Sequence, residues 1–253
     1  MMKTENKFDI WFNVFILAGM FAAVAVTNIY KLQQPDARRF MLIFASVGAL
    51  TGVVNTVLSA NGNIWTFLFG VIDVSVASVM AFDSSIRPGG EPVWGNFALH
   101  AFYFLPMQFV GWRQWRKRGA TSHEKVKARR LTAGQGAVAA VVLVAGTAAA
   151  YFILCGVSGA ASSGSVLRYG ILFDAAVLTL NILGQILMSM AFMEQWIVWL
   201  LVNVFSILLW SDKAMSSADA SYTVVMVIKY SFYLLNSVNG LRIWLKLSRN
   251  GSY

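Results

Sequence analysis

Hydrophobic residues in this chain gather into long runs, and short polar stretches separate one run from the next. Eight of the runs carry little or no charge. Each is roughly 17 to 25 residues long, the length that a helix needs to cross the hydrocarbon core of a bilayer. The runs cover Trp11–Ile29, Phe40–Ser59, Ile64–Phe82, Val93–Trp112, Ala133–Val157, Leu172–Phe192, Gln195–Ser211 and Tyr222–Ile243. The pattern predicts an all-α membrane protein with about eight transmembrane helices.

Composition indicates the same class of protein. Hydrophobic residues make up 58% of the chain and charged residues 12%, and the mean hydropathy is +0.63. Because water-soluble domains carry about 25% charged residues, lipid is the expected solvent for most of this chain. The single cysteine, Cys155, lies in an apolar run and has no second cysteine with which to form an intrachain disulfide.

Two groups of three runs resemble one another. They span Phe40–Trp115 and Leu172–Trp244, and each ends in the pattern Gly-x-Arg-x-Trp. At a nearly constant offset, the aligned polar pairs are Asn55 with Gln185 and Asp73 with Asn203. An odd number of helices in each group requires one extra crossing to give both groups the same orientation, and Ala133–Val157 supplies it. The sequence therefore predicts an N-terminal helix followed by a 3+1+3 parallel repeat.

The expected organisation has six parts. Residues 1–31 form an N-terminal tail and the additional helix, 39–118 the first three-helix repeat, 119–131 a basic cytoplasmic loop, 132–158 the linker helix, 170–247 the second repeat and 248–253 a C-terminal tail.

Positive charge is concentrated around one loop, which sets the expected orientation. The basic residues are Arg113, Arg116, Lys117, Arg118, Lys125, Lys127, Arg129 and Arg130. By the positive-inside rule this loop is cytoplasmic, and so are both termini. Lys31, Arg38 and Arg39 lie on the opposite side by this count, so the orientation of the first helix stays open.

Polar side chains at membrane depth mark where chemistry is expected, because each is costly there unless it has a partner. Helical spacing places most of them on shared faces of the predicted helices. The candidate substrate-binding residues are Asn55, Asp73, Gln108, Asn181, Gln185, Trp196, Trp199, Asn203, Tyr233, Asn236 and Asn239. Interhelical hydrogen bonding is the alternative role for Asp73, and headgroup anchoring is the alternative for the two tryptophans.

Several of these residues lie in segments that resemble the PnuC family of bacterial nicotinamide riboside transporters. The similar segments are Met193–Asn203 and Asn236–Trp244, with Phe69–Val74 and Gly111–Trp115 in the first repeat. Asp73 stands where the family pattern leads us to expect Asn. The resemblance covers Phe40 to Trp244.

The resemblance implies a fold similar to the SWEET sugar carriers and uptake of the riboside across the bacterial inner membrane. It also implies facilitated diffusion without an ion or nucleotide motor, drawn inward because a cytoplasmic kinase phosphorylates the substrate. The expected mechanism is alternating access, with the two bundles rocking around a site at mid-membrane depth.

The chemistry of this ligand suits the candidate residues. Nicotinamide riboside presents a cationic aromatic ring, a carboxamide and a hydroxyl-rich sugar. A flat cation favours the face of tryptophan, which gives Trp196 and Trp199 a stacking role. Amide side chains offer a donor and an acceptor together, so Gln108, Gln185, Asn203, Asn236 and Asn239 are the expected hydrogen-bonding groups. Few cations are expected in this lining, so the mononucleotide, with its phosphate, is expected to bind less well.

Other functions stay open at this stage. A thiamine or riboflavin carrier, or a sugar facilitator of the same fold, would use the same amides and tryptophans. A membrane enzyme using Asp73, Asp174 or His100 is the alternative from another class, but the chain lacks His-Glu-x-x-His and Gly-x-Ser-x-Gly. No cofactor is expected, and small residues on the lipid-facing helices suit a homo-oligomer such as a trimer.

Overall fold

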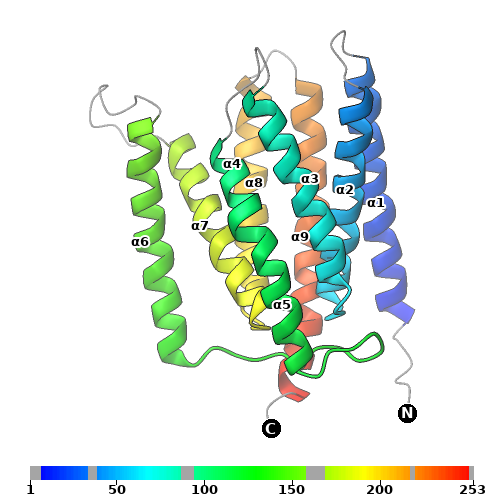
Figure 1. The fold of residues 1–253 in the computed structure, drawn as a ribbon, viewed down its shortest axis with the longest axis vertical. Coiled ribbons are helices and arrows are strands. Elements are labelled where there is room, and N and C mark those ends of the chain that lie inside the picture. Colours follow the sequence, from blue (N-terminus) through cyan, green and yellow to red (C-terminus); the bar gives the residue numbers. More distant parts are fainter. Residues whose placement is uncertain (1–6, 34–38, 87–93, 158–168, 217–219, 251–253) are drawn as a thin grey trace. The chain divides into compact units, whose positions relative to one another are not determined.

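The computed structural model describes residues 7–33, 39–86, 94–157, 169–216 and 220–250. The chain divides into two compact units, Met1–Lys127 and Ala128–Tyr253, and each is described by itself. In the described ranges all regular elements are helical (Figure 1). The all-α class predicted from the sequence is confirmed.

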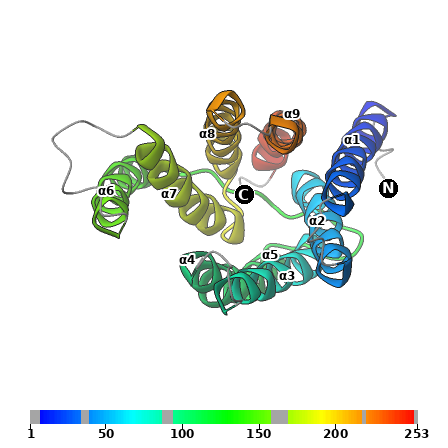
Figure 2. The same ribbon diagram turned by 90° about the horizontal axis from the view of Figure 1, so that it is seen from above.

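Within the described residues, the first unit contains four helical segments. They are α1 (Lys7–Leu32), α2 (Arg39–Ala60), α3 (Thr66–Ile86) and a composite of α4 (Trp94–Ala98), the π-helix η1 (Leu99–Phe104) and α5 (Leu105–Lys117). Viewed from above, α1 lies on the far side of α2 from α3 (Figure 2). Asn28 of α1 donates to the Ser46 hydroxyl of α2 at 2.6 Å, so the additional N-terminal helix packs on the first predicted repeat.

The π-helix precedes a proline, which gives it a physical cause. Pro106 has no backbone N–H and its ring crowds the carbonyl four residues earlier. The chain widens there, and the Leu105 N–H bonds back to the His100 carbonyl, five residues earlier.

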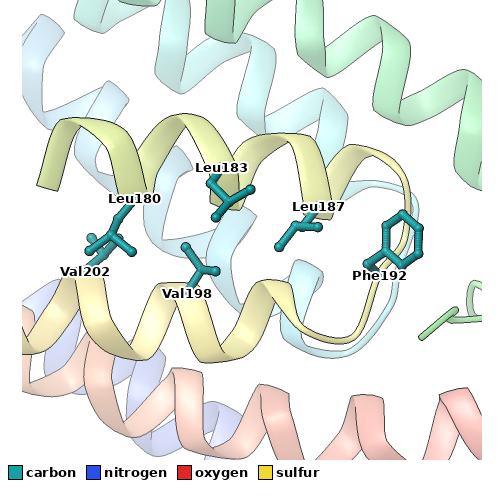
Figure 3. Packing of buried hydrophobic residues seen from close by; sticks show 6 residues of the cluster. All are labelled: Leu180, Leu183, Leu187, Phe192, Val198 and Val202. Carbon is teal, nitrogen blue, oxygen red and sulfur yellow. The ribbon is translucent and has the colours of Figure 1, made fainter. Parts of the chain in front are cut away.

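The second unit also contains four helices within the described residues: α6 (Ala133–Val157), α7 (Tyr169–Ser189), α8 (Gln195–Ser216) and α9 (Ala220–Asn250). Its apolar core lies between α7 and α8 (Figure 3). Leu180, Leu183 and Leu187 project from one side, and Val198 and Val202 meet them from the other. The spacing of three and four residues brings each set onto one helix face.

Many apolar side chains of these helices are exposed, as expected for helices that lie in a bilayer. Within the described ranges, five helices are long and apolar enough to cross a membrane: α1, α2, α3, α6 and α7. The apolar part of α8 is shorter, Gln195–Ser211. The membrane-spanning segment of α6 has no buried residue, and Val138, Val141 and Phe152 are more than half exposed. Exposed apolar side chains of this kind are expected of a helix that faces lipid.

Helix boundaries differ from those expected at several points, and two of the differences change the predicted organisation. The run Leu172–Phe192 was expected to be helical throughout, but α7 ends at Ser189 because Ala191 adopts a left-handed backbone with φ of 59°. At the other end of the unit, α9 continues to Asn250, so residues 248–250 are helical and not part of a tail.

The α2–α3 turn and the α7–α8 turn are closed by the same hydrogen bonds. These are Gly62 N–H to Ser59 O (2.9 Å) and Asn63 N–H to Leu58 O (3.0 Å) in the first unit, and Ala191 N–H to Met188 O (3.0 Å) and Phe192 N–H to Leu187 O (2.9 Å) in the second. Both sets form the Schellman motif that ends a helix at a left-handed residue. The pattern recurs 129 residues later, as residues 62 and 191 show. At this offset Asn55 corresponds to Gly184 and Asp73 to Val202. The pairing expected from the sequence, Asn55 with Gln185 and Asp73 with Asn203, is therefore shifted by one residue.

The basic segment between the units is bonded to the turn of each. Val126 donates its backbone N–H to the Gly62 carbonyl at 3.0 Å, and Arg129 donates to the Ala191 carbonyl at 2.8 Å. Val126 and Ala128 are each 1% exposed, whereas Lys127 and Arg129 are exposed. Apolar side chains therefore alternate with basic ones along this segment.

Candidate substrate site

The tryptophan-rich start of α8 interlocks with a glycine of α9. A methyl group at Gly240 would lie 2.5 Å from Cε3 of Trp196, so the indole rests directly on the backbone of α9. Trp244 lies at the side of the same indole, with ring centroids 6.3 Å apart. Trp196 is 2% exposed, and its Nε1 is buried without a hydrogen-bond partner in the described part of the chain.

The first unit contains the same arrangement, a buried ring packed on a helix glycine with a tryptophan beside it, but with a smaller ring; this arrangement is called the interlock in both units. A methyl group at Gly111 would overlap the Phe67 ring. Trp115 packs edge-on against Phe67, with ring centroids 4.8 Å apart. Gly111, Phe67 and Trp115 stand 129 residues before Gly240, Trp196 and Trp244.

Trp199 lies one turn further along α8 and faces a different neighbour. A methyl group at Gly184 of α7 would lie 3.1 Å from the Trp199 ring, and the indole packs against the edge of the leucine cluster. Trp196 and Trp199 were both expected to stack on the substrate, but Trp196 packs toward α9 and Trp199 toward α7. Only the Trp199 ring keeps part of its surface exposed.

Three asparagines from α8 and α9 are buried in the second unit. Asn203 is 6% exposed and donates through Nδ2 to the Ser237 hydroxyl at 3.0 Å. Asn236 and Asn239 on α9 are 0% and 4% exposed. Ser237, itself 1% exposed, was not singled out from the sequence, although it lies between the two α9 asparagines.

Asn239 is held by an arginine one turn along the same helix. Its Oδ1 accepts hydrogen bonds from Nε of Arg242 at 3.1 Å and from a terminal guanidinium nitrogen at 2.8 Å. The Nδ2 of Asn239 is buried and has no partner among the described residues. The spacing of three residues between Asn239 and Arg242 could have signalled this pair.

The α7 amides bond within their own helix. Gln185 is 5% exposed and donates to the Ser189 hydroxyl at 3.2 Å. Asn181 is half-buried and donates to the Val177 carbonyl at 2.7 Å.

On α9, Tyr233 is half-buried, and the Lys229 ammonium lies 5.5 Å from the centre of its ring. The Tyr233 ring, which was expected to contact the substrate, therefore also takes part in a cation–π contact with Lys229.

The first unit gathers the remaining candidates around two glycines. The Gln108 side chain packs on Gly70, and a methyl group at Gly70 would lie 3.4 Å from Nδ2 of Asn55. Gln108 is 3% exposed and donates to the Phe104 carbonyl at 3.2 Å, whereas its Oε1 has no partner in the described ranges. The Asp73 carboxyl lies over Gly52, 3.0 Å from where a methyl group would stand.

Two of the residues considered for an enzyme lie in different units. His100 directs Nδ1 to the Asn96 carbonyl of its own helix at 2.8 Å, and Asp174 is exposed on α7. Among the described residues, no three acidic, histidine or cysteine side chains are grouped so as to hold a metal ion.

Comparison with known proteins gives a consistent family. The family model described as "Nicotinamide mononucleotide transporter" matches residues 42–246. Two proteins named nicotinamide riboside transporter PnuC are similar: the one from Neisseria mucosa is 30% identical, over 96% of this chain and 82% of its own length, and the one from Haemophilus influenzae is 28% identical, over 94% and 89%. A crystal structure of the vitamin B3 transporter PnuC superposes with a TM-score of 0.67 and 28% identity, over 98% of this chain and 94% of that one.

These matches exclude the enzyme alternative, because the family is one of transporters. The helical architecture and the matched length lead to one assignment: this chain belongs to the nicotinamide mononucleotide transporter family, the family of the PnuC membrane transporters.

Proposed function

We propose that this protein takes up nicotinamide riboside across the bacterial inner membrane by facilitated diffusion with alternating access. The relatives from Neisseria mucosa and Haemophilus influenzae are named nicotinamide riboside transporters, which supports this substrate. Intracellular phosphorylation by a cytoplasmic riboside kinase draws the substrate inward, and no ion or nucleotide motor takes part.

The observation that carries the proposal is the set of buried amides beside two tryptophans in the second unit. Asn203, Asn236 and Asn239 are each at most 6% exposed. Polar side chains at this depth are costly unless they serve a partner or a ligand. The ring carboxamide and the ribose hydroxyls of the riboside match such groups, and the partly exposed Trp199 offers a face for the cationic ring.

We further propose that the protein is a 3+1+3 parallel repeat of the SWEET type, with α6 as the linker helix. The matched turns at Gly62 and Ala191 support the repeat. So do the interlocks at Gly111 and Gly240, which lie at the same offset. The basic loop 119–131 and both termini face the cytoplasm in this proposal, by the distribution of Lys and Arg. The working form is a homo-oligomer such as a trimer.

In the first unit we propose substrate-binding roles for Asn55, Asp73 and Gln108. Gln108 is buried, and its Oε1 has no partner among the described residues, which supports its assignment as an acceptor. In the second unit, Asn181, Gln185 and Tyr233 complete the candidate set, with the intrahelical bonds of the two amides as competing partners.

Calorimetric titration of the detergent-purified protein tests the proposal. Nicotinamide riboside, thiamine, riboflavin and glucose are titrated in parallel, with Asn203→Leu as the site variant. Binding of the riboside alone, lost in Asn203→Leu, is the expected result. Binding of thiamine in place of the riboside would keep the carrier class and move the substrate, since thiamine is also an aromatic cation.

A further inference from the structure

The Asn239 carboxamide has only one orientation that its surroundings allow. A guanidinium group donates hydrogen bonds and accepts none. Since two nitrogens of Arg242 lie 2.8 and 3.1 Å from the same Asn239 atom, that atom must be the oxygen. The NH2 group therefore points away from Arg242. No flip of the amide is compatible with the pair.

The consequence is a buried donor without an acceptor. Asn239 is 4% exposed, and its Nδ2 has no partner in the part of the chain that the structure describes. Trp196 packs on the next residue, Gly240, and its indole N–H is also buried without a partner. A buried unsatisfied donor costs free energy, so two of them, one on α8 and one on α9, point to an acceptor that the described residues do not provide.

We propose that Arg242 is a positioning residue that fixes Asn239 as a hydrogen-bond donor toward the substrate. The substrate group that meets it is an acceptor, the carboxamide oxygen or a ribose hydroxyl oxygen of the riboside. The inference rests on the proposed function for the identity of this ligand. The orientation of Asn239 does not depend on it.

The first unit supplies a matched control. Arg113 occupies the same position in the Gly-x-Arg-x-Trp pattern as Arg242. Val110, which is 37% exposed, stands where Asn239 stands in the second unit, and Arg113 is exposed. Arg113 therefore has no amide side chain three residues before it, and its replacement removes the same charge without the same effect.

Affinity for nicotinamide riboside, measured by calorimetry in a double-mutant cycle, tests the role of Arg242. Arg242→Met is expected to weaken binding about tenfold, because the carboxamide becomes free to turn. Within an Asn239→Leu background the same substitution is expected to change affinity less than about twofold. Arg113→Met leaves affinity unchanged. An equal loss from Arg242→Met in both backgrounds, or the same loss from Arg113→Met, overturns the inference.

A second variant separates binding from folding. Asn239→Asp keeps an oxygen for Arg242 and replaces the buried NH2 by an acceptor. The expected result is an unchanged or higher melting temperature with at least tenfold weaker riboside binding. Full affinity in this variant would show that the substrate does not accept a hydrogen bond from residue 239.

A spectroscopic readout keeps the inference testable even if the riboside proves to be the wrong ligand. With 15N-labelled asparagine side chains, the NH2 resonance of Asn239 is identified by its loss in Asn239→Leu. In ligand-free protein this resonance is expected to shift in Arg242→Met and not in Arg113→Met. Absence of the shift overturns the positioning role, whereas absence of riboside binding by the wild-type protein overturns only the proposed function.

Discussion

The turn between α2 and α3 and the turn between α7 and α8 have the same hydrogen bonds, yet the first places Gly62 at the left-handed residue and the second places Ala191 there. The same contrast of side chains runs through the helices beyond the turns. At the matched positions Asn55 and Gly70 meet in the first unit, and Gly184 and Trp199 meet in the second.

In each pair one residue is glycine and the side chain of the other packs against it. The glycine stands at the second matched position (Gly70) in the first unit and at the first matched position (Gly184) in the second unit. In the first unit the glycine lies on α3, and amide side chains from α2 and α5 approach it. In the second the glycine lies on α7, and an indole from α8 covers it. The two turns have the same hydrogen bonds, whereas the contact at these matched positions joins an amide to a glycine in the first unit and an indole to a glycine in the second.

Removal of the large ring from each interlock is the strongest way to probe this comparison. Trp115 and Trp244 are both 0% exposed, so Trp115→Ala and Trp244→Ala each leave a cavity that costs roughly 3 to 5 kcal/mol. The expected result is a large fall in melting temperature for both, measured by thermal unfolding in detergent. A large fall for one variant and none for the other would mean that the two interlocks do not contribute equally to the stability of the protein.

Filling the glycines acts on the same contacts with a smaller effect. A methyl group at Gly240 or Gly111 collides with a buried ring, and overpacking of this kind costs about 1 to 3 kcal/mol. Gly240→Ala and Gly111→Ala are expected to lower the melting temperature, whereas Gly136→Ala on α6, with no atom within 4 Å of the new methyl group, is the control. An unchanged melting temperature in Gly240→Ala would contradict the close contact with Trp196.

Replacement of two asparagines of the second unit ranks the binding roles proposed for them. Asn203→Leu removes the bond to Ser237 and is expected to weaken riboside binding by at least about tenfold, roughly 1.4 kcal/mol. Asn181→Leu removes only a bond within α7 and is expected to have a smaller effect. Calorimetry on the two variants side by side measures the difference, and equal losses would argue against the ranking.

The exchange of the two turn residues has the smallest expected effect. Alanine at a positive φ is strained relative to glycine. Ala191→Gly is therefore expected to gain less than about 1 kcal/mol, since the added flexibility of the unfolded chain offsets part of the relief. Gly62→Ala is expected to lose about 1 kcal/mol by the same reasoning. Melting temperatures that move in the same direction in both variants would contradict the turn geometry.

The helices were predictable because their signal is one of length and polarity. The expected run Ala133–Val157 coincides with α6, and Phe40–Ser59 differs from α2 by one residue at each end. A bilayer leaves a helix little choice, since each backbone polar group must be satisfied within the segment. The lengths and positions of the apolar runs carry that information.

The ends of α7 and α9 were less predictable. Nothing in the apolar run through Leu187 and Phe192 indicates that Ala191 turns left-handed, because glycine is the usual residue there. On α9 the polar residues Ser248 and Arg249 suggest a tail, yet the Ser248 hydroxyl accepts a hydrogen bond from Arg130 at 3.0 Å. A partner so distant in sequence has no local signal.

Among the candidate site residues, periodicity found the buried amides and missed what they bond to. Asn203, Asn236 and Gln108 are buried as their positions at membrane depth indicated. The division of Trp196 and Trp199 between two neighbouring helices depends on Gly184 and Gly240, which were not treated as site residues. The small residues that admit a large side chain from another helix are visible only when the helices are placed together.

The segment of alternating Val126, Lys127, Ala128 and Arg129 has a practical consequence for labelling. Its charge and its position between two helical units make it look like a convenient place to insert a reporter peptide. Because its amides are bonded to the two turns, one added residue would exchange the buried and the exposed side chains. The exposed bend at Ser122 and His123, closed by the Thr121 N–H on the Glu124 carbonyl at 3.1 Å, is the better point of insertion.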